Sequence, residues 1–119
     1  MPTATYSAQD VIQHHLQALA SNDLDALMDD YTEQSELWTA EGVITGIDAI
    51  SSFFNYAFTL LPKKKTAFHI QKMIVRSGKV YLVWNADSPV VHIPFAADTF
   101  EVIKGKIILQ TTAFQAEML

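Results

Sequence analysis

The amino-acid sequence predicts an α+β domain, in which helices pack on one face of a bent, mostly antiparallel sheet. In the first half of the chain, apolar residues recur at helical spacing. In the second half, strand-like apolar runs are separated by turn residues. The 119 residues are 50% hydrophobic and 11% aromatic, which is typical of a globular protein and fits one domain over residues 1–119. Helices followed by a meander of strands are typical of the α+β class.

Three helices are expected before Pro62, which cannot continue the last of them. The first helix begins after Ser7, a suitable N-cap with Asp10 three residues further on. The break Ser21-Asn22-Asp23 caps a second helix, whose apolar side is expected to carry Leu24, Leu27, Met28 and Tyr31. The third helix carries an unbroken apolar stripe formed by Ile47, Ile50, Phe53, Phe54, Ala57, Phe58 and Leu61.

Two short strands and four long ones are expected around and after the third helix. The short strands, residues 36–39 and 43–45, flank a turn at Glu41-Gly42. The long strands are separated by turn and loop residues and cover residues 67–76, 80–86, 96–103 and 106–114. The run 80–86 is apolar on both faces, so we expect this strand to be central and covered on both sides.

Composition and charge exclude several classes of function. The formal net charge of −5 argues against a nucleic-acid partner, because phosphate binding needs a basic face. The chain has no cysteine and its four histidines lack the spacing of a metal-binding pair, so no metal and no other cofactor is expected. No apolar run is long enough to span a membrane, and the start of the chain lacks the pattern of a signal peptide. We therefore expect a cytoplasmic protein.

Charged residues are sparse, at 18% of the chain. Apolar surface is then expected to be hidden, either in a pocket or in an interface between copies of the chain. The apolar runs at residues 80–84 and 107–109 favour a homodimer formed through the outer face of the sheet. The chain contains no nucleophile elbow, phosphate-binding loop or dinucleotide fingerprint.

Two polar residues, Asp98 and His15, fall on faces that are otherwise apolar. Asp98 shares its strand face with Ala96, Phe100 and Val102. An isolated ionised carboxylate in such a place either raises its pKa or finds a partner. His15 lies on the stripe of the first helix that should face the sheet. Each residue is either a core group with its hydrogen bonds made or part of the floor of a pocket. If the helix covers the sheet, the two side chains can meet, and the carboxylate can fix the imidazole tautomer.

Three segments together resemble the SnoaL-like and ketosteroid-isomerase-like families of the nuclear-transport-factor-two-like superfamily. They are HHLQALASNDLDALMDDY, LWTAEGVITGIDAISSFF and DTFEVIKGKIILQTTAF. Each segment is a weak signal alone, but their order and spacing are similar to those families from about Ser7 to Phe114. The resemblance implies a cystatin-like cone of three helices packed on a strongly curved sheet around an apolar pocket, and often a dimer through the outer face of the sheet.

The resemblance also implies roles for particular residues. In ketosteroid isomerases, a first-helix tyrosine and a strand aspartic acid donate hydrogen bonds to a developing oxyanion. The strand aspartic acid matches Asp98, and the tyrosine position matches His15, which keeps a possible donor with a different pKa. The position of the family's catalytic base matches Ala40, which has no acidic group. Glu41 is a possible base only if its turn bends inward, and is otherwise an exposed turn residue.

The sequence leaves three functions open. One is an isomerase, cyclase or dehydratase that acts on a small apolar molecule with His15 and Asp98 as catalytic residues. The others are a non-catalytic domain that binds a hydrophobic ligand, and a dimerisation module with a vestigial pocket; Ala40 favours these two. His92 is expected in a loop at the pocket mouth. The candidate ligand-pocket residues are Trp38, Phe54, Phe58, Trp84, Phe100 and Phe114.

Overall fold

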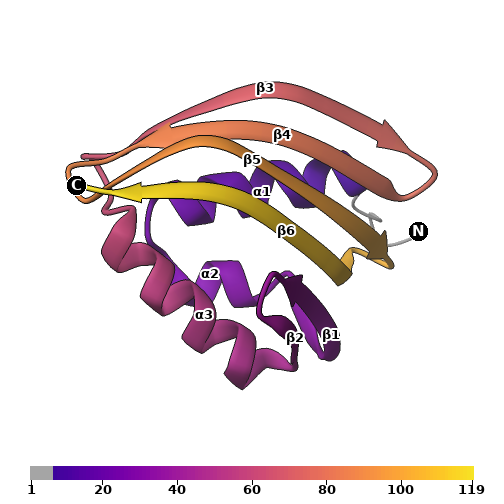
Figure 1. The fold of residues 1–119 in the computed structure, drawn as a ribbon. Coiled ribbons are helices and arrows are strands. Elements are labelled where there is room, and N and C mark those ends of the chain that lie inside the picture. The colour runs from indigo at the N-terminus through magenta and orange to yellow at the C-terminus, as the bar shows by residue number, and fades with distance from the viewer. Residues whose placement is uncertain (1–6) are drawn as a thin grey trace.

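The computed structural model describes residues 7–119, which form three helices and a six-stranded sheet (Figure 1). The helices are α1 (Ala8–Ala20), α2 (Leu24–Met28) and α3 (Ile47–Leu60). The strands are β1 (Tyr31–Thr39), β2 (Gly42–Thr45), β3 (Ala67–Arg76), β4 (Lys79–Asp87), β5 (Val91–Ile103) and β6 (Lys106–Met118). The α+β class predicted from the sequence is confirmed. Within this part of the chain, no helix is both long and apolar enough to cross a membrane.

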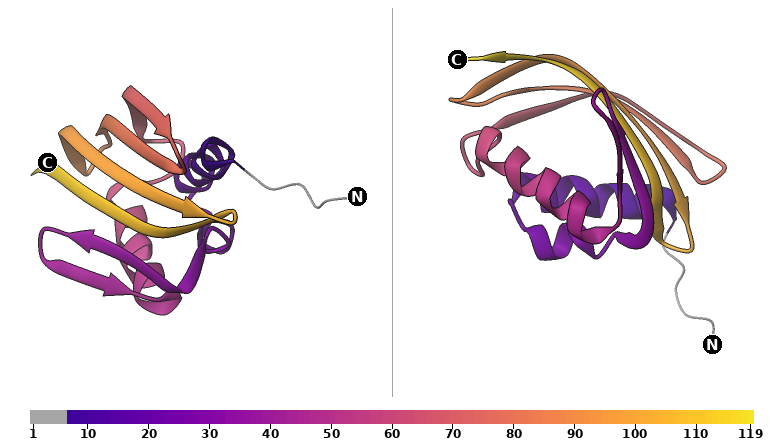
Figure 2. Two further views of the ribbon diagram at one scale, coloured as in Figure 1. Left: turned by 90° about the vertical axis from the view of Figure 1, so that its right-hand side faces the viewer. Right: turned by 60° about the horizontal axis from the view of Figure 1, so that its bottom comes forward.

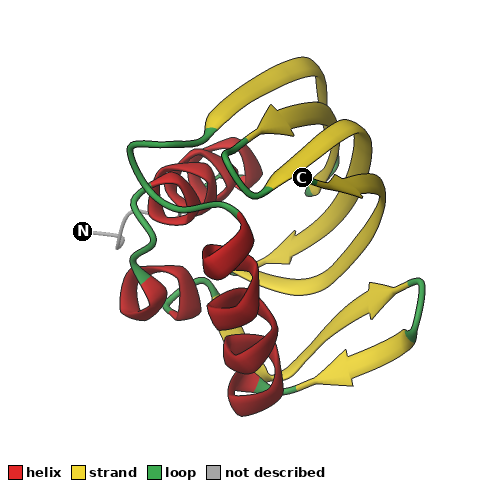
Figure 3. Cartoon of the chain, turned by 60° about the vertical axis from the view of Figure 1, so that its left-hand side comes forward, coloured by secondary structure: helices red, strands yellow, loops and turns green. Residues whose placement is uncertain are grey.

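The sheet is strongly curved, and its strands follow the order β2-β1-β6-β5-β4-β3. Neighbouring strands are antiparallel, except for β1 and β6, which are parallel. The helices lie on the concave side of the sheet, with α1 against β3, β4 and β5 and α3 beside the β1–β2 hairpin (Figures 2 and 3). The sheet therefore has an inner face covered by helices and an outer face that no other element covers within the described residues.

Capping side chains explain where the first two helices begin. Ser7 Oγ accepts a hydrogen bond from the Asp10 N–H at 3.1 Å, and the Asp10 carboxylate accepts one from the Ser7 N–H at 3.2 Å. This is the predicted capping box, which satisfies amide groups that have no partner inside α1. Asp23 Oδ1 accepts from the Ala26 N–H at 3.1 Å and caps α2 in the same way.

The core fills the space between the helices and the inner face of the sheet. All three helices and four of the strands contribute to it through the large, fully buried side chains of Ile12, Leu27, Leu37, Ile50, Leu82, Phe100 and Ile107. Burying one such side chain contributes roughly 1.5–3 kcal/mol. This cluster ties α1 and α3 to the sheet and so fixes the walls of the space between them.

The second helix is shorter than predicted, because the chain leaves it to pair with β6. Met28 is the last helical residue, and the Asp30 carbonyl accepts a hydrogen bond from the Ile107 N–H at 2.7 Å. Tyr31 therefore begins β1 instead of lying on the helix, and its side chain is buried. The prediction that Tyr31 lies on the second helix is wrong. The helical spacing of apolar residues contains no information about a strand partner as distant in the sequence as β6.

The last two strands are longer than predicted, and the expectation that His92 lies in a loop is wrong. Ser88 Oγ accepts hydrogen bonds from the N–H groups of Val90 and Val91, both at 3.0 Å, and donates to the Leu60 carbonyl at 2.7 Å. This tight turn leads directly into β5, where His92 is the second residue and its imidazole contacts the Asp87 carboxylate.

The outer face of the sheet carries a continuous row of side chains, one from each strand. Pairing in register aligns Ile74, Tyr81, Thr99, Thr111, Trp38 and Val43, which we call the outer-face row. Val80 and Leu82 of β4 are buried on the inner face, but Tyr81 between them is 41% exposed. The prediction that residues 80–86 are covered on both sides is therefore wrong for the single chain.

Candidate functional site

A cavity of about 90 Å³ lies between α1, α3 and the inner face of the sheet. Its wall is apolar apart from four polar side chains, His15, Asp98, Gln110 and Thr112, and the indole N–H of Trp84. A neighbouring cavity of about 130 Å³ shares His15, Trp84 and Asp98 with the first. The two polar exceptions identified in the sequence therefore lie at the same place in the fold.

Asp98 is held by three hydrogen-bond donors. Register places it between Leu82 of β4 and Thr112 of β6, and its side chain is only 6% exposed. Its Oδ1 accepts from Trp84 Nε1 at 3.2 Å and from Thr112 Oγ1 at 2.9 Å, and its Oδ2 accepts from Gln110 Nε2 at 2.9 Å. Burial raises the pKa of Asp98 above the ordinary value, and these three hydrogen bonds oppose that rise.

His15 enters the same space from α1. Its ring is 2% exposed and meets the rings of Phe100 and Phe54 edge-on, at centroid distances of 5.2 and 5.8 Å. Burial, with a smaller contribution from the neighbouring His14, lowers the pKa of His15 to about 3. The imidazole is therefore neutral at physiological pH and is a weak base.

Two further side chains connect His15 to Asp98. His15 Nδ1 lies 3.5 Å from the hydroxyl oxygen of Tyr31, and that hydroxyl donates to Gln110 Oε1. Gln110 Nε2 in turn donates to Asp98, as described above. No direct hydrogen bond joins His15 to Asp98 within residues 7–119, so the connection runs through Tyr31 and Gln110. Burial raises the pKa of Tyr31 well above its usual value, and the Asp98 charge adds to this effect, so the phenol keeps its proton.

The structure divides the aromatic candidates into two groups. Phe54, Trp84 and Phe114 line the cavity of about 90 Å³, and Phe100 lines the neighbouring one. Phe58 packs against the core, and neither cavity includes it among its lining residues. Trp38 lies on the outer face and is 46% exposed.

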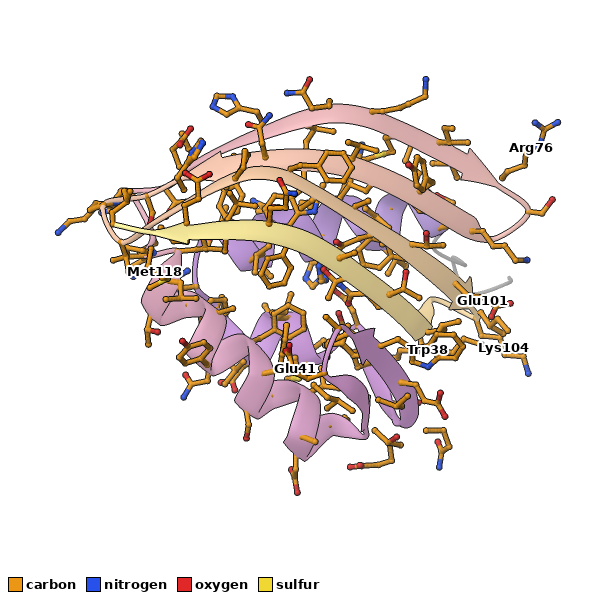
Figure 4. All side chains as sticks on the ribbon, viewed as in Figure 1. Trp38, Glu41, Arg76, Glu101, Lys104 and Met118 are labelled. Atoms are coloured by element: carbon orange, nitrogen blue, oxygen red, sulfur yellow. The ribbon has the colours of Figure 1, made fainter. Side chains whose placement is uncertain are left out.

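The family's base position does not reach the cavity. Glu41, labelled in Figure 4, lies in the turn between β1 and β2. Both Glu41 and Ala40 before it are exposed. Neither residue lines either cavity. Within residues 7–119, no three histidine, aspartate or glutamate side chains are grouped as a metal site would require.

A larger cleft, of about 620 Å³, lies on the surface beside α1 and the turn between β5 and β6. His14 Nδ1 lies 2.8 Å from Asp30 Oδ2 in this cleft. Charged residues including Asp10, Lys104 and Lys106 line most of the remainder. This lining does not suit an apolar molecule, so we place the candidate site in the inner cavity although it is smaller.

Sequence reasoning missed Tyr31, Gln110 and Thr112. Counting back from the hairpin turn between β5 and β6 places Thr111 opposite Asp98. A bulge next to Val102 shifts the register by one residue and brings Thr112 there instead. The polar residues Gln110 and Thr112 at alternate positions were the one available signal for a polar inner face on β6.

Comparison with known proteins agrees with this fold. An NTF2-like protein of unknown function from Cytophaga hutchinsonii ATCC 33406 is 17% identical, with a TM-score of 0.74 over 97% of this chain and 95% of that chain. A candidate SnoaL-like polyketide cyclase from Shewanella putrefaciens CN-32 is 15% identical, with a TM-score of 0.73 over 96% and 80%. A candidate ketosteroid isomerase from Kribbella flavida DSM 17836 is 10% identical, with a TM-score of 0.74 over 91% and 77%.

At these identities the likeness shows a shared fold, and it confirms the curved sheet and helices that the resemblance implied. No curated protein matches the sequence. The model of the SnoaL-like domain matches residues 12–110, which are most of the chain and include His15, Tyr31, Asp98 and Gln110. This chain therefore belongs to the SnoaL-like domain family.

Proposed function

We propose that this chain binds a small, mostly apolar molecule in the inner cavity and catalyses a proton transfer on it, as an isomerase, cyclase or dehydratase does. The observation that supports the proposal is the buried Asp98 carboxylate in a mostly apolar cavity wall. Buried titratable groups with shifted pKa values are concentrated at functional sites. A carboxylate whose pKa is raised is also a better proton acceptor.

In this proposal Asp98 accepts the proton. Three donors occupy three of the roughly four lone-pair positions of a carboxylate, which leaves one for a ligand proton. His15 orients the ligand, because an imidazole with a pKa of about 3 is too weak a base to lead the reaction. A base at Asp98 also removes the need for an acidic group at Ala40 or Glu41, both of which are exposed.

A second candidate is a non-catalytic domain that holds a hydrophobic ligand. The exposed Ala40 at the family's base position favours it, since the acidic group of the ketosteroid isomerases is missing there. Both candidates need a ligand in the same cavity and differ only in whether Asp98 takes a proton from it.

Deuterium exchange into 2-hydroxyacetophenone separates the two candidates. This small aromatic ketone has acidic C–H groups, and NMR in D₂O follows both its binding and the exchange of those protons. We expect the protein to accelerate exchange, and Asp98→Asn to lower the rate roughly 10²–10⁴-fold, the usual contribution of a positioned base. Glu101→Gln is the matched control, because Glu101 lies on the same strand with its side chain paired to Lys79 at 3.9 Å on the surface. Binding without acceleration would leave the ligand-binding domain as the function.

We also propose a homodimer formed through the outer face of the sheet. The support is the outer-face row, in which Ile74, Tyr81, Trp38 and Val43 are between 41% and 60% exposed in the single chain. Large apolar side chains that are exposed on one face of a sheet favour an interface there. The expectations of a cytoplasmic location and of one domain over residues 1–119 remain predictions.

A further inference from the structure

The hydrogen bonds around Asp98 have a fixed direction. When Asp98 is ionised, its carboxylate accepts from Trp84 and Thr112 and offers only lone pairs to its third partner, Gln110. Gln110 therefore presents its Nε2 hydrogen to Asp98 and turns its Oε1 toward Tyr31. The amide orientation follows from this network of partners, which is the way in which amide orientations are assigned.

That direction continues through Tyr31 to His15. The single hydroxyl hydrogen of Tyr31 goes to Gln110 Oε1, so the oxygen presents a lone pair to His15 Nδ1 at 3.5 Å. This contact is attractive only if Nδ1 carries the ring hydrogen. A neutral imidazole has one N–H, so Nε2 then has a lone pair and acts as an acceptor.

The Nε2 atom of His15 is accessible from the cavity. Nε2 makes no hydrogen bond within residues 7–119. In this part of the chain every fully buried side-chain nitrogen or oxygen has a hydrogen-bond partner, so Nε2 is not fully buried. His15 lines both cavities. Nε2 is therefore in contact with space that a ligand or a water molecule can occupy.

We infer that the ligand is an uncharged ring carrying a hydroxyl group, of the phenol or enol class, whose O–H donates to His15 Nε2. This inference rests on the proposed function, because it names the class of ligand for the same cavity. The hydrogens of the Trp84 indole, the Thr112 hydroxyl and one Gln110 N–H are all directed at Asp98. A carbonyl oxygen placed at His15 would face a lone pair, whereas a hydroxyl group would complete the chain of hydrogen bonds.

Asp98→Asn should reverse the whole chain. The oxygen of the introduced amide still accepts from Trp84 and Thr112, but its NH₂ group now donates to Gln110. Gln110 then turns its Oε1 toward position 98 and its Nε2 toward Tyr31, and the Tyr31 hydroxyl donates to His15 Nδ1. The ring hydrogen of His15 must then move to Nε2, which becomes a donor.

The test has two independent readouts, the tautomer of His15 and the relative affinity for phenol and toluene. Nitrogen-15 NMR of His15 in the protein without ligand should show the Nδ1–H tautomer, and Asp98→Asn should show the Nε2–H tautomer.

Phenol and toluene, which are matched in size, should bind with similar affinity to the unsubstituted protein, because the hydrogen bond offsets the cost of burying the hydroxyl group. In Asp98→Asn the phenol oxygen can only accept from Nε2–H, and a phenol is a weaker acceptor than donor. We therefore expect the affinity ratio of phenol to toluene to fall, by up to about tenfold, which corresponds to about 1.4 kcal/mol. Glu101→Gln should leave both readouts unchanged.

An Nε2–H tautomer in the unsubstituted protein would overturn the inference and leave the proposed function standing. Toluene bound more than tenfold tighter than phenol would do the same, because it would show a cavity with no acceptor for the hydroxyl group. If neither probe binds, the proposed ligand cavity fails, and the class of ligand fails with it. Benzylamine is a further control: tighter binding of this cation than of phenol would show that the Asp98 charge, and not the His15 acceptor, selects the ligand.

Discussion

Gln110 Nε2 donates to Asp98 Oδ2 at 2.9 Å while the other end of the same amide accepts from Tyr31. One side chain thus supplies a partner to two buried polar groups on different strands. Gln110 is itself 2% exposed, so water cannot take its place without a change in the surrounding structure.

Gln110→Leu should destabilise the protein by about 1–3 kcal/mol, because it leaves Asp98 and Tyr31 each short of a hydrogen-bond partner. Gln110→Glu should cost more at neutral pH, since it places a second carboxylate against Asp98. Urea unfolding measures both effects. Gln115→Leu makes the same substitution at an exposed position on β6 and should change stability little. Equal effects at positions 110 and 115 would contradict the role given to the amide.

The stability of the folded protein should depend on pH through His15. Its pKa is about 3 in the folded state and 6.5 in the unfolded chain, so between these values the unfolded state binds the additional proton. Acidification through this window therefore removes stability, by up to about 1.4 kcal/mol per pH unit. His15→Leu removes this contribution, so its free energy of unfolding should fall less steeply than that of the unsubstituted protein below about pH 6.5.

The buried carboxyl groups act in the opposite direction. Burial raises the pKa of Asp98 and Asp30, so each contributes stability at low pH that is lost as the pH rises through its raised pKa. Both groups are present in His15→Leu, and the difference between the two proteins isolates His15. His69→Leu, at an exposed position on β3, is the control and should follow the unsubstituted protein. Parallel pH profiles for all three proteins would show that His15 does not carry this linkage.

The outer-face row should determine the oligomeric state. Light scattering should give twice the chain mass of 13.3 kDa for the unsubstituted protein at micromolar concentration. Tyr81→Glu should shift the mass toward the single chain, because it places a charge in the outer-face row that forms the proposed interface. Tyr56→Glu on α3 is the matched control: Tyr56 is 64% exposed and lies away from the sheet's outer face. A mass near 13.3 kDa before any substitution would refute the dimer.

Two hairpin turns offer a test of local packing. Gly78 and Gly105 have nearly the same backbone, with φ of 78° and 77°. A Cβ at Gly78 would lie 3.1 Å from the Val102 carbonyl oxygen, whereas a Cβ at Gly105 would meet nothing within 4 Å. Gly105→Ala should cost about 1–2 kcal/mol for the left-handed conformation alone, and Gly78→Ala should cost more. Thermal unfolding of the two variants checks the order, and equal melting temperatures would contradict it.

The fold was largely predictable from the sequence, because its signals are local. The Ser7–Asp10 capping box, the apolar stripe of α3 and the glycine turns of the later hairpins each act over a few residues. The errors in the predicted elements lie where pairing between strands far apart in the sequence decides the local structure. Tyr31 departs from its helical pattern because Ile107 pairs with the neighbouring Asp30, and a one-dimensional pattern does not contain that pairing.

The candidate site was predictable only in part. His15 and Asp98 stood out as polar residues on apolar faces, and the structure places both at the inner cavity. The residues between them could not be found by counting, since the bulge next to Val102 changes which β6 side chain faces Asp98. Trp38 is a large aromatic residue of the kind that lines pockets, but it lies at a position of β1 whose side chain points to the outer face. Strand register decides which alternate residues point outward.

The parallel pairing of β1 with β6 has a consequence for how the protein folds. Tyr31 and Gln110 meet across a separation of 79 residues, whereas β3 to β6 are joined by short connections. Closing so long a loop carries an entropic cost that neighbouring hairpins avoid, and contacts of high sequence separation slow folding. We therefore expect the β3–β6 meander to form early and β1 to dock late. The hydrogen-bonded chain from Asp98 to His15 would be complete only after that last step, so a kinetic intermediate would contain most of the sheet without the complete candidate site.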